Sequence, residues 1–458
     1  MTTEQSTGHP PRSGQLIDGE GALGNPSPTL TLTAALLGFA LITLDASVVN
    51  VALPAMGSAL GGGLSGLQWV VDAYTLSFAA LMLSTGAFAD RAGASRAYGI
   101  GIALFTLASA ACGCAPNLAT LIGARVVQGV AAAVVLPASL ALVRQAYPDA
   151  VRRARAVSVW AAGGSAAIAF GPVAGGALTS LWDWRGIFFV NLPLGAVALA
   201  LLLRAPRSPR RPAPLDLPGQ LLAVVTLTAL TFAVIEGGTT GLAALGVAVV
   251  AGAVFVRVEN RQAHPVVPFA LFRSRAVAVP VAVGAACSVA FFGMVFVFSL
   301  FFQRVQGHSA LYAGLMFLPM SGLIAVTNLA AGRLTARYGA RVPMLLGQSV
   351  AVLGLALLLY VDGGTAAPLV AVLLIPLALG CALTVPPLTA AMMEAVPSDR
   401  AGLAAGVLNA ARQVAGGLSV AVFGALVNGG FEVGMRYSLV LALGLFVVTG
   451  VLTARVRS

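Results

Sequence analysis

The amino-acid sequence predicts an all-α polytopic membrane protein with fourteen transmembrane helices, and three observations support this. Of the 458 residues, 59% are hydrophobic and only 9% are charged, whereas a soluble domain carries roughly 25% charged residues. Apolar stretches of about 20 residues, the length that crosses a hydrocarbon core, recur from Leu30 to Val456. Short arginine-rich segments separate these stretches at alternate loops, as the topology of a multi-spanning protein requires.

Apolar runs bounded by Gly, Pro and charged residues define the individual spans. The first eight are expected at residues 30–55, 68–89, 97–115, 119–144, 155–180, 186–204, 217–236 and 240–257. The last six are expected at residues 276–303, 311–331, 343–361, 367–392, 401–427 and 434–454. Because fourteen is an even number, both ends of the chain should share one side of the membrane.

The distribution of arginine indicates which side that is. All 26 basic residues are Arg, which is typical of a GC-rich bacterial genome. Alternate loops hold Arg91 and Arg96; Arg144, Arg152, Arg153 and Arg155; Arg204, Arg207, Arg210 and Arg211; Arg257, Arg261, Arg273 and Arg275; and Arg333, Arg337 and Arg341. The positive-inside rule therefore predicts a bacterial cytoplasmic membrane protein with both termini cytoplasmic. The net charge of +11 then reflects topology, and no nucleic-acid partner is expected.

A weak internal repeat divides the chain into two halves. The segment Gly86-Ala-Phe-Ala-Asp-Arg-Ala-Gly93 recurs as Gly332-Arg-Leu-Thr-Ala-Arg-Tyr-Gly339, each time after the second span of a six-helix unit. Duplicated halves are common in transporters. The expected organisation is a disordered tail at 1–28, a six-helix bundle at 29–204, a linker at 205–216, a two-helix insert at 217–258, a loop at 259–275 and a second six-helix bundle at 276–455.

Charged residues within the spans are candidate functional residues, because a charge at a helix centre costs about 2.5–3.5 kcal/mol on insertion scales. The strongest are Asp45, Asp72, Arg125 and Arg412. A desolvated carboxyl group favours its neutral form, so Asp45 could exchange a proton, or it could be a structural carboxylate with an interhelical partner. Arg125 cannot lose its proton; it could control a nearby carboxylate or form a fixed ion pair.

Two further motifs have both a functional and a structural interpretation. The loop that contains Asp90 and Arg91 could form a conformational latch or only a tight basic turn; its candidate residues are Gly86, Asp90, Arg91, Gly93 and Arg96. In the fifth span, small residues and a proline permit close helix approach and bending, and they could serve gating or packing alone; these residues are Gly171, Pro172, Gly175 and Gly176.

A substrate cavity and the absence of a metal site are also expected. Polar residues within the spans that could line a cavity are Asn50, Tyr74, Gln128 and Arg412, although Tyr74 could instead face the membrane interface and Arg412 could lie near the cytoplasmic end. The four cysteines, Cys112, Cys114, Cys287 and Cys381, all fall in apolar runs without a histidine at ligand spacing, so they are interpreted as small lipid-facing or packing residues rather than metal ligands.

These motifs, in this order, resemble the fourteen-helix drug:proton antiporters of the major facilitator superfamily. The resemblance extends from Asp45 to Arg412 and includes Leu44-Asp45 to Pro54, Gly86 to Arg96, Arg125-Val-Val-Gln-Gly129, Gly171 to Gly176, Trp184 to Pro193 and Phe302 to Ser309. Each motif alone is weak, but their joint order is specific. Ser158 and Ala167 stand where the antiporter motif usually has glycine, and Ala336 replaces the acid in the second copy of the loop motif.

The resemblance implies a major facilitator fold and proton-driven export of small amphipathic or antibiotic-like molecules by alternating access. It implies that Asp45 carries the proton, that Arg125 relays it, that Asp72 is a further coupling candidate, and that Asp90 with Arg91 forms the latch. The proton gradient would supply the energy, so no cofactor is expected, and the chain is expected to function as a monomer in the lipid bilayer. A proton-coupled importer, or a transporter of one metabolite, is the alternative; an enzyme is not expected.

Overall fold

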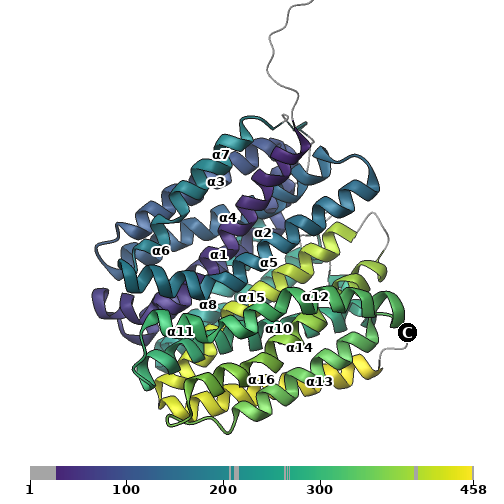
Figure 1. Ribbon diagram of the computed structural model, residues 1–458. Coiled ribbons are helices and arrows are strands. Elements are labelled where there is room, and N and C mark those ends of the chain that lie inside the picture. Colours follow the sequence, from purple (N-terminus) through teal and green to yellow (C-terminus); the bar gives the residue numbers. More distant parts are fainter. Residues whose placement is uncertain are drawn as a thin grey trace, which may run out of the picture.

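The computed structural model describes residues 27–205, 208–210, 216–262, 265, 267, 269–396 and 401–455. All regular secondary structure in these residues is helical, and the helices form two groups that lie side by side (Figure 1). The first group contains α1 (Pro28–Leu60), α2 (Gly63–Ala92), α3 (Ala94–Gly113), α4 (Leu118–Ala146), α5 (Ala150–Leu181), α6 (Gly186–Phe189) and α7 (Asn191–Leu202). Within it α1 packs on α5, and α4 packs on both α2 and α3.

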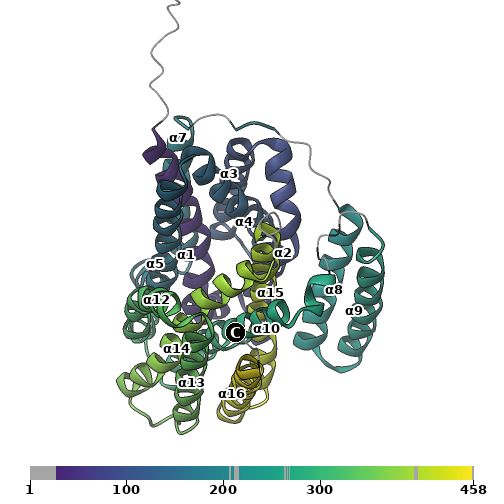
Figure 2. The same cartoon turned by 90° about the vertical axis from the view of Figure 1, so that its right-hand side faces the viewer.

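The second group follows a helical hairpin and a short 3-10 helix. The hairpin is α8 (Leu217–Glu236) with α9 (Gly238–Glu259), and the 3-10 helix η1 spans Phe269–Arg273. The second group contains α10 (Arg275–Leu300), the π-helix η2 (Phe301–Val305), α11 (Ala310–Met316), α12 (Leu318–Tyr338), α13 (Arg341–Leu358), α14 (Ala367–Glu394), α15 (Ala401–Asn428) and α16 (Phe431–Arg455). Figure 2 shows α8 and α9 at the edge of the molecule, where α8 packs against α2 and α15.

The helices confirm a multi-pass membrane protein, whereas the number of fourteen spans stays a prediction. Eleven described helices are long and apolar enough to cross a membrane, or up to thirteen if two bent pairs each count as one span. One bent pair is α2, whose axis turns by 65° between Met82 and Ser84; the other is α11 with α12, at 41°. The expected span at 186–204 is a shorter apolar stretch, Gly186–Leu202, that is divided into α6 and α7.

The turns that end α2 and α12 support the internal repeat. Gly93 follows α2 with φ +88°, and Gly339 follows α12 with φ +76°. Only glycine adopts this conformation without steric cost, so both copies of the motif end in the same kind of turn. Gly93 is also needed for space, because a Cβ atom there would lie 2.9 Å from the carbonyl oxygen of Ser208.

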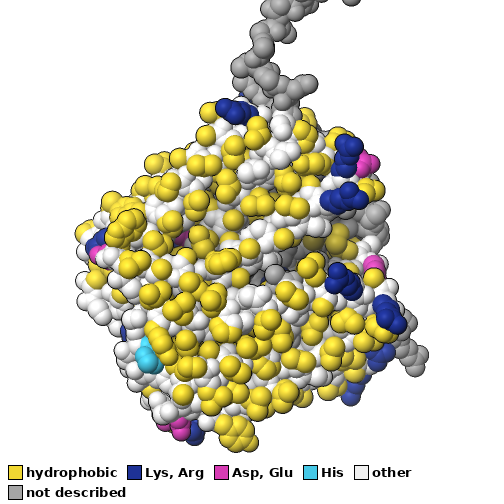
Figure 3. Space-filling view, in the orientation of Figure 1, with side chains coloured by type: hydrophobic (Ala, Val, Ile, Leu, Met, Phe, Trp, Pro, Cys, Tyr) yellow, Lys and Arg dark blue, Asp and Glu magenta, His cyan; other side chains and the backbone are white. Residues whose placement is uncertain are grey.

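The surface has the two zones expected of a membrane protein. Hydrophobic side chains cover most of the face in Figure 3, and most of the arginines on it gather along its upper right side. The beginning of α1 and the end of α16 also lie on this side (Figure 1). We call this the arginine-rich end and the other the arginine-poor end. A lipid-facing surface requires such an apolar band, because water is absent from the bilayer core.

Candidate functional site

A fully buried ion pair joins α1 to α4. The Nη1 atom of Arg125 donates to Oδ2 of Asp45, and the two side chains are 1% and 0% exposed. Arg125 also donates from Nε to the carbonyl oxygen of Val70 on α2 at 3.1 Å. Since removing one member of a buried pair leaves an uncompensated charge, this pair constrains how α1, α2 and α4 can move.

Four further polar side chains complete a network around the pair. Asn191, at the start of α7, donates from Nδ2 to Oδ1 of Asp45 at 2.8 Å and to Oγ of Ser109 at 3.0 Å. Gln128 accepts from Arg125 Nη1 at 3.0 Å and lies with its Nε2 atom 3.3 Å from Oδ1 of Asp45. The thiol of Cys112 donates to Oε1 of Gln128 at 3.1 Å. Both oxygens of Asp45 therefore have donors.

Aromatic rings form the remaining wall of this network. The guanidinium carbon of Arg125 lies 4.3 Å from the centre of the Tyr74 ring and 5.9 Å from that of Phe188. Tyr74 itself is 1% exposed and donates to the carbonyl oxygen of Ile42 at 3.0 Å. Tyr74 and Gln128, which were candidates for the cavity wall, are thus packed inside the N-terminal group of helices.

Asp72 lies apart from this network. It is 0% exposed, and neither of its carboxyl oxygens has a hydrogen-bond partner among the described residues. Its Oδ1 atom would lie 3.7 Å from a Cβ atom at Gly417, so the carboxyl group faces α15 across the boundary between the two groups of helices. An unpartnered polar group at a buried helix boundary is costly, which distinguishes Asp72 from the fully paired Asp45.

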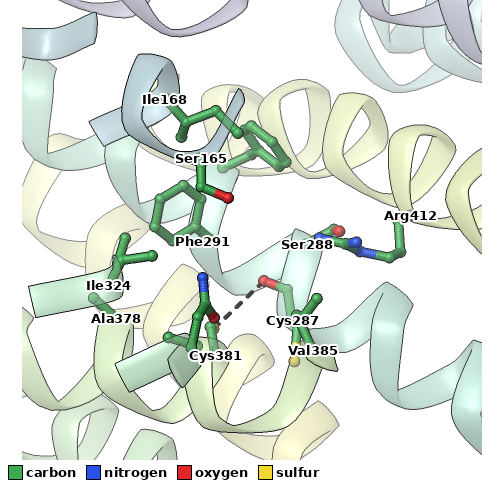
Figure 4. Close-up of a pocket in the computed structure, with 13 residues that line it drawn as sticks. Ser165, Ile168, Cys287, Ser288, Phe291, Ile324, Ala378, Cys381, Val385 and Arg412 are labelled. Atoms are coloured by element: carbon green, nitrogen blue, oxygen red, sulfur yellow. Dashed lines mark hydrogen bonds between the residues drawn. The ribbon is translucent and has the colours of Figure 1, made fainter. Parts of the chain in front are cut away.

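A cavity of about 140 Å³ lies between the two groups of helices (Figure 4). Its lining comes from α5, α10, α12, α14 and α15, and comprises Ser165, Ile168, Cys287, Ser288, Phe291, Phe292, Ile324, Asn328, Ala378, Cys381, Ala382, Val385 and Arg412. Figure 3 shows the surface hollowed between the two groups toward the arginine-rich end. Of the four proposed cavity residues, Arg412 lines this cavity.

Contacts near the arginine-poor end join the two groups of helices. Asn50, the fourth proposed cavity residue, is 3% exposed, and its carbonyl oxygen accepts from Ser299 Oγ on α10 at 2.8 Å. Gln68 on α2 donates to the carbonyl oxygens of Val420 and Ala421 on α15 at 3.2 and 2.7 Å. Two further hydrogen bonds between the groups lie toward this end: Gln303 donates to the carbonyl oxygen of Val51 at 3.0 Å, and the backbone N–H of Leu311 donates to Ser180 Oγ at 3.1 Å.

The glycines of the Gly171–Gly176 segment allow neighbouring helices to approach α5 closely. A Cβ atom at Gly175 would lie 2.6 Å from the carbonyl oxygen of Val48 on α1, and one at Gly171 would overlap the Ser47 side chain. A Cβ atom at Gly176 would meet the carbonyl oxygen of Ala310 and lie 2.9 Å from Cα of Leu311. Pro172 lies inside α5, and its carbonyl oxygen would meet a Cβ atom at Gly314 on α11.

The loop between α2 and α3, which was proposed as a latch, forms no ion pair with any residue of the described chain. Asp90, Arg91 and Arg96 are exposed, and none of them pairs with another residue of the described chain. Gly86 is half-buried, with open space beside its Cα atom. The linker contacts this turn instead: Ser95 and Ser208 each donate a backbone N–H to the other's hydroxyl at 3.0 Å.

No group of three or more His, Cys, Asp or Glu residues with metal-ligand geometry exists in the described chain. Cys112, Cys287 and Cys381 are buried, and Cys381 lies with its Sγ atom 3.8 Å from the carbonyl oxygen of Cys287. Cys114 is exposed at the end of α3, unlike the other three cysteines.

Comparison with known proteins identifies the class of protein that this fold and site define. A family model for the Major Facilitator Superfamily matches residues 35–420, so the chain belongs to this family of membrane transporters and is not an enzyme. Within it, the chain belongs with drug and antibiotic resistance exporters.

Three relatives support this placement. The multidrug resistance protein Stp of Mycobacterium tuberculosis is 41% identical over 413 residues, which cover 88% of this chain and 76% of the relative. The methylenomycin A resistance protein of Streptomyces coelicolor is 36% identical, covering 92% and 91%. The tetracenomycin C resistance and export protein of Streptomyces glaucescens is 30% identical, covering 89% and 77%.

Solved structures support the fold. A bacterial homologue of the human lysosomal transporter Spinster, in an inward-facing and unoccupied conformation, superposes with a TM-score of 0.67 at 16% identity, over 94% of this chain and 97% of the other. A D-xylose–proton symporter superposes with a TM-score of 0.66 at 14% identity, over 93% and 97%.

Proposed function

We propose that this chain exports small amphipathic molecules from the cell in exchange for protons, across a bacterial cytoplasmic membrane with both termini cytoplasmic. The observation that carries the proposal is the sealed Asp45–Arg125 network, found in a chain whose relatives are named for drug and antibiotic resistance. A buried acid whose charge has one cationic partner is suited to proton exchange, because protonation cancels the charge and breaks the pair.

In this mechanism Asp45 binds the proton and Arg125 responds to it. Protonation of Asp45 would leave Arg125 as an unpaired buried cation, which costs several kcal/mol. The helices that carry the two residues, α1 and α4, would then rearrange until Arg125 finds other acceptors. Gln128, which already accepts a hydrogen bond from Arg125 at 3.0 Å, is the nearest of these.

Asp72 is the second proposed coupling site. Its carboxyl group faces α15 without a hydrogen-bond partner in the described chain, and a lone charge there would be strongly penalised. Separation of α2 from α15 would admit water to it. Asp72 would therefore exchange its proton only when the two halves open, which links proton release to the conformational cycle.

Alternating access gives the remaining roles. The contacts at the arginine-poor end would form the outer closure, and the hollow at the arginine-rich end would admit substrate from the cytoplasm. Gly171, Pro172, Gly175 and Gly176 allow the close approach of α5 to α1 and α11 on which that closure depends. Asp90 and Arg91 would pair as a latch in the opposite state, with Gly86, Gly93 and Arg96 shaping the same loop.

We also propose that all fourteen predicted spans cross the membrane. The two halves would be 29–204 and 276–455, with 217–258 as the two-helix insert between them, and with 1–28, 205–216 and 259–275 on the cytoplasmic side. The bent and short helices would then be complete spans. The chain would function as a monomer, without a cofactor and without nucleic acid, with the proton gradient as its energy source.

Transport into inverted membrane vesicles tests this proposal. The vesicles would contain matched amounts of wild type, Asp45→Asn or the exposed-loop control Asp362→Asn, and would be energised to acidify their interior. The compounds would be ethidium, 1-naphthamide and 1-naphthoate, which differ in charge. We expect wild type and Asp362→Asn to accumulate at least one of them in a protonophore-sensitive manner, and Asp45→Asn to lose at least nine-tenths of that accumulation.

Three results would contradict the proposal. Gradient-driven accumulation in right-side-out vesicles, but not in inverted ones, would indicate the proton-coupled importer instead. Protonophore-insensitive transport would contradict proton coupling itself. As a third contrary result, an Asp45→Asn variant as active as wild type would remove Asp45 from the coupling mechanism.

A further inference from the structure

The cavity between the two halves contains a cation, Arg412, that forms no ion pair with any residue in the described part of the chain. Arg412 extends from the middle of α15 toward Ser288 of α10 (Figure 4). Its Nε atom has no acceptor, and the ion pairs of the described chain are Asp45–Arg125 and Asp183–Arg185. Because a guanidinium group stays charged at any physiological pH, the cavity carries a permanent positive charge.

Further polar groups with unused hydrogen-bonding capacity lie beside this cation. The Oγ atom of Ser288 is buried without a partner in the described chain, and the residue is 2% exposed. Asn328 of α12 also lines the cavity. Buried polar groups are nearly always hydrogen-bonded, so an unsatisfied hydroxyl next to an unsatisfied guanidinium indicates that a ligand or water completes both.

Apart from Ser165, the rest of the lining is apolar, and it contains no acid. Phe291 and Phe292 of α10 lie with their rings perpendicular to each other, 5.5 Å apart, and Ile168 of α5 and Ile324 of α12 add aliphatic side chains. Rings and aliphatic side chains suit the hydrocarbon part of a ligand. None of the lining residues is Asp or Glu, so this site has no counter-charge for a cationic ligand.

The stem of Arg412 is held in place from behind. A Cβ atom at Gly284 would lie 3.2 Å from Cγ and 3.3 Å from Cδ of Arg412, so the side chain packs against the backbone of α10. A guanidinium group held in this way presents its donors in a fixed planar fork, which matches the two oxygens of a carboxylate.

We propose that the cavity binds the carboxylate group of amphipathic organic acids, with Arg412 as the anion-binding residue, Ser288 as an additional donor and the two phenylalanines against the apolar body. This inference rests on the proposed export function and assigns its substrate class: small organic anions in preference to lipophilic cations. Asp45 and Asp72 lie outside this cavity and do not contribute a competing negative charge to its lining.

Three ligands that share one ring system and differ in charge test the assignment. They are 1-naphthoate, 1-naphthamide and 1-naphthylmethylammonium, and their binding to the purified full-length protein in lipid nanodiscs would be measured by isothermal titration calorimetry at pH 7. We expect 1-naphthoate to bind at least ten-fold more tightly than either of the others. Arg412→Gln should weaken its binding at least ten-fold and change that of 1-naphthamide less than three-fold.

Two further variants separate charge from folding. Arg412→Lys keeps the charge but loses the fork, and should retain part of the affinity for 1-naphthoate. Arg257→Gln removes an exposed arginine of α9, away from the cavity, and should bind all three ligands as wild type does. Unchanged thermal unfolding of Arg412→Gln would show that lost affinity is not lost structure.

The inference is overturned if the folded wild type fails to bind 1-naphthoate, binds the ammonium compound equally well, or binds 1-naphthoate independently of Arg412. Because the nanodisc measurement uses no proton gradient, these outcomes are independent of the vesicle experiment. Failure of proton-driven export would leave the binding result unaffected, and failure of anion binding would leave export of other molecules possible.

Discussion

At the scale of single residues, the pairing of Asp45 with Arg125 determines how much each residue contributes to the free energy of unfolding. Either charge alone in this environment should destabilise the protein by about 3–5 kcal/mol. We therefore expect Asp45→Asn and Arg125→Gln to lower the free energy of unfolding by that amount singly. In the double variant, the loss of unfolding free energy should be smaller than the sum of the two single losses by at least about 2 kcal/mol, because no unpaired charge remains.

Denaturant unfolding in mixed micelles would measure this coupling. The matched control is the exposed pair Asp183–Arg185, whose side chains are 52% and 34% exposed at a separation of 3.3 Å. Exposed pairs contribute at most about 1 kcal/mol, so the corresponding Asn and Gln substitutions should be nearly additive. Additive losses at the buried pair would show that its charges do not depend on each other.

The sequence identified the charged members of this network and Gln128, but not its other neutral members. Asp45 and Arg125 stand out because an intramembrane charge is costly wherever it lies. Asn191, Ser109 and Cys112 carry no such signal, since a neutral polar side chain in an apolar run is equally compatible with packing. Their role depends on the contact between Asn191 and Asp45, which are 146 positions apart in the chain, and such a contact follows only from the tertiary structure.

At the scale of helices, the start of α8 illustrates how a polar cap stabilises an apolar element. Oδ1 of Asp216 accepts from the backbone N–H of Gly219 at 2.9 Å and from Nε2 of Gln262 at 2.6 Å. Burial alone would raise the pKa of Asp216, but these hydrogen bonds lower it below its usual value. The charged form is therefore favoured in the folded protein.

A depressed pKa gives this cap a defined pH dependence. Its stabilisation is present above the unfolded-state pKa, about 4, and is lost as pH falls through the lower pKa of the folded state. Asp216→Ala should cost about 1 kcal/mol at pH 7, and the difference from wild type should shrink as pH falls below about 4. Unfolding measured from pH 7 to pH 3 checks this, and a difference that stays constant over that range would contradict it.

Helix positions follow from the sequence more readily than helix shapes. The apolar period locates the spans to within several residues, as the predicted 367–392 and the observed α14, Ala367–Glu394, illustrate. The break between α11 and α12 falls at Pro319, in the first turn of α12, so a proline marks it in the sequence. The 65° turn in α2 near Ser84 does not follow from the sequence, because α2 contains no proline. Such bends depend on packing against neighbouring helices, which a single-chain pattern does not contain.

At the scale of the whole molecule, the glycines of α5 connect local packing to the conformational cycle. Gly176 meets α11 of the other half through backbone atoms. A methyl group there should force α5 and α11 apart, so Gly176→Ala should favour the state that is open at the arginine-poor end. We expect transport to fall at least ten-fold.

Labelling with a membrane-impermeant maleimide would report this shift. The reporter is Ala313→Cys on α11, because Ala313 is 0% exposed while α5 and α11 are in contact. The background carries Cys114→Ser, which removes the exposed native cysteine. Labelling from the outer face should be several-fold faster with Gly176→Ala. The matched control is Gly246→Ala in α9, where a Cβ atom meets nothing within 4 Å; equal labelling in both variants would contradict a role for Gly176 in closure.

The attachment of the α8–α9 hairpin determines which parts of the molecule move together. Glu236, at one end of α8, accepts from Ser65 Oγ at 3.1 Å and from Trp69 Nε1 at 3.4 Å, both on α2. Near the other end of α8, Gln220 donates to the carbonyl oxygen of Ala80, also on α2. In the described chain α8 forms no such bonds with α15. The hairpin is thus hydrogen-bonded to the first half near both ends of α8, whereas it only packs against the second half. A rocking motion of the two halves would therefore move the hairpin together with the N-terminal half, while α15 slides along α8.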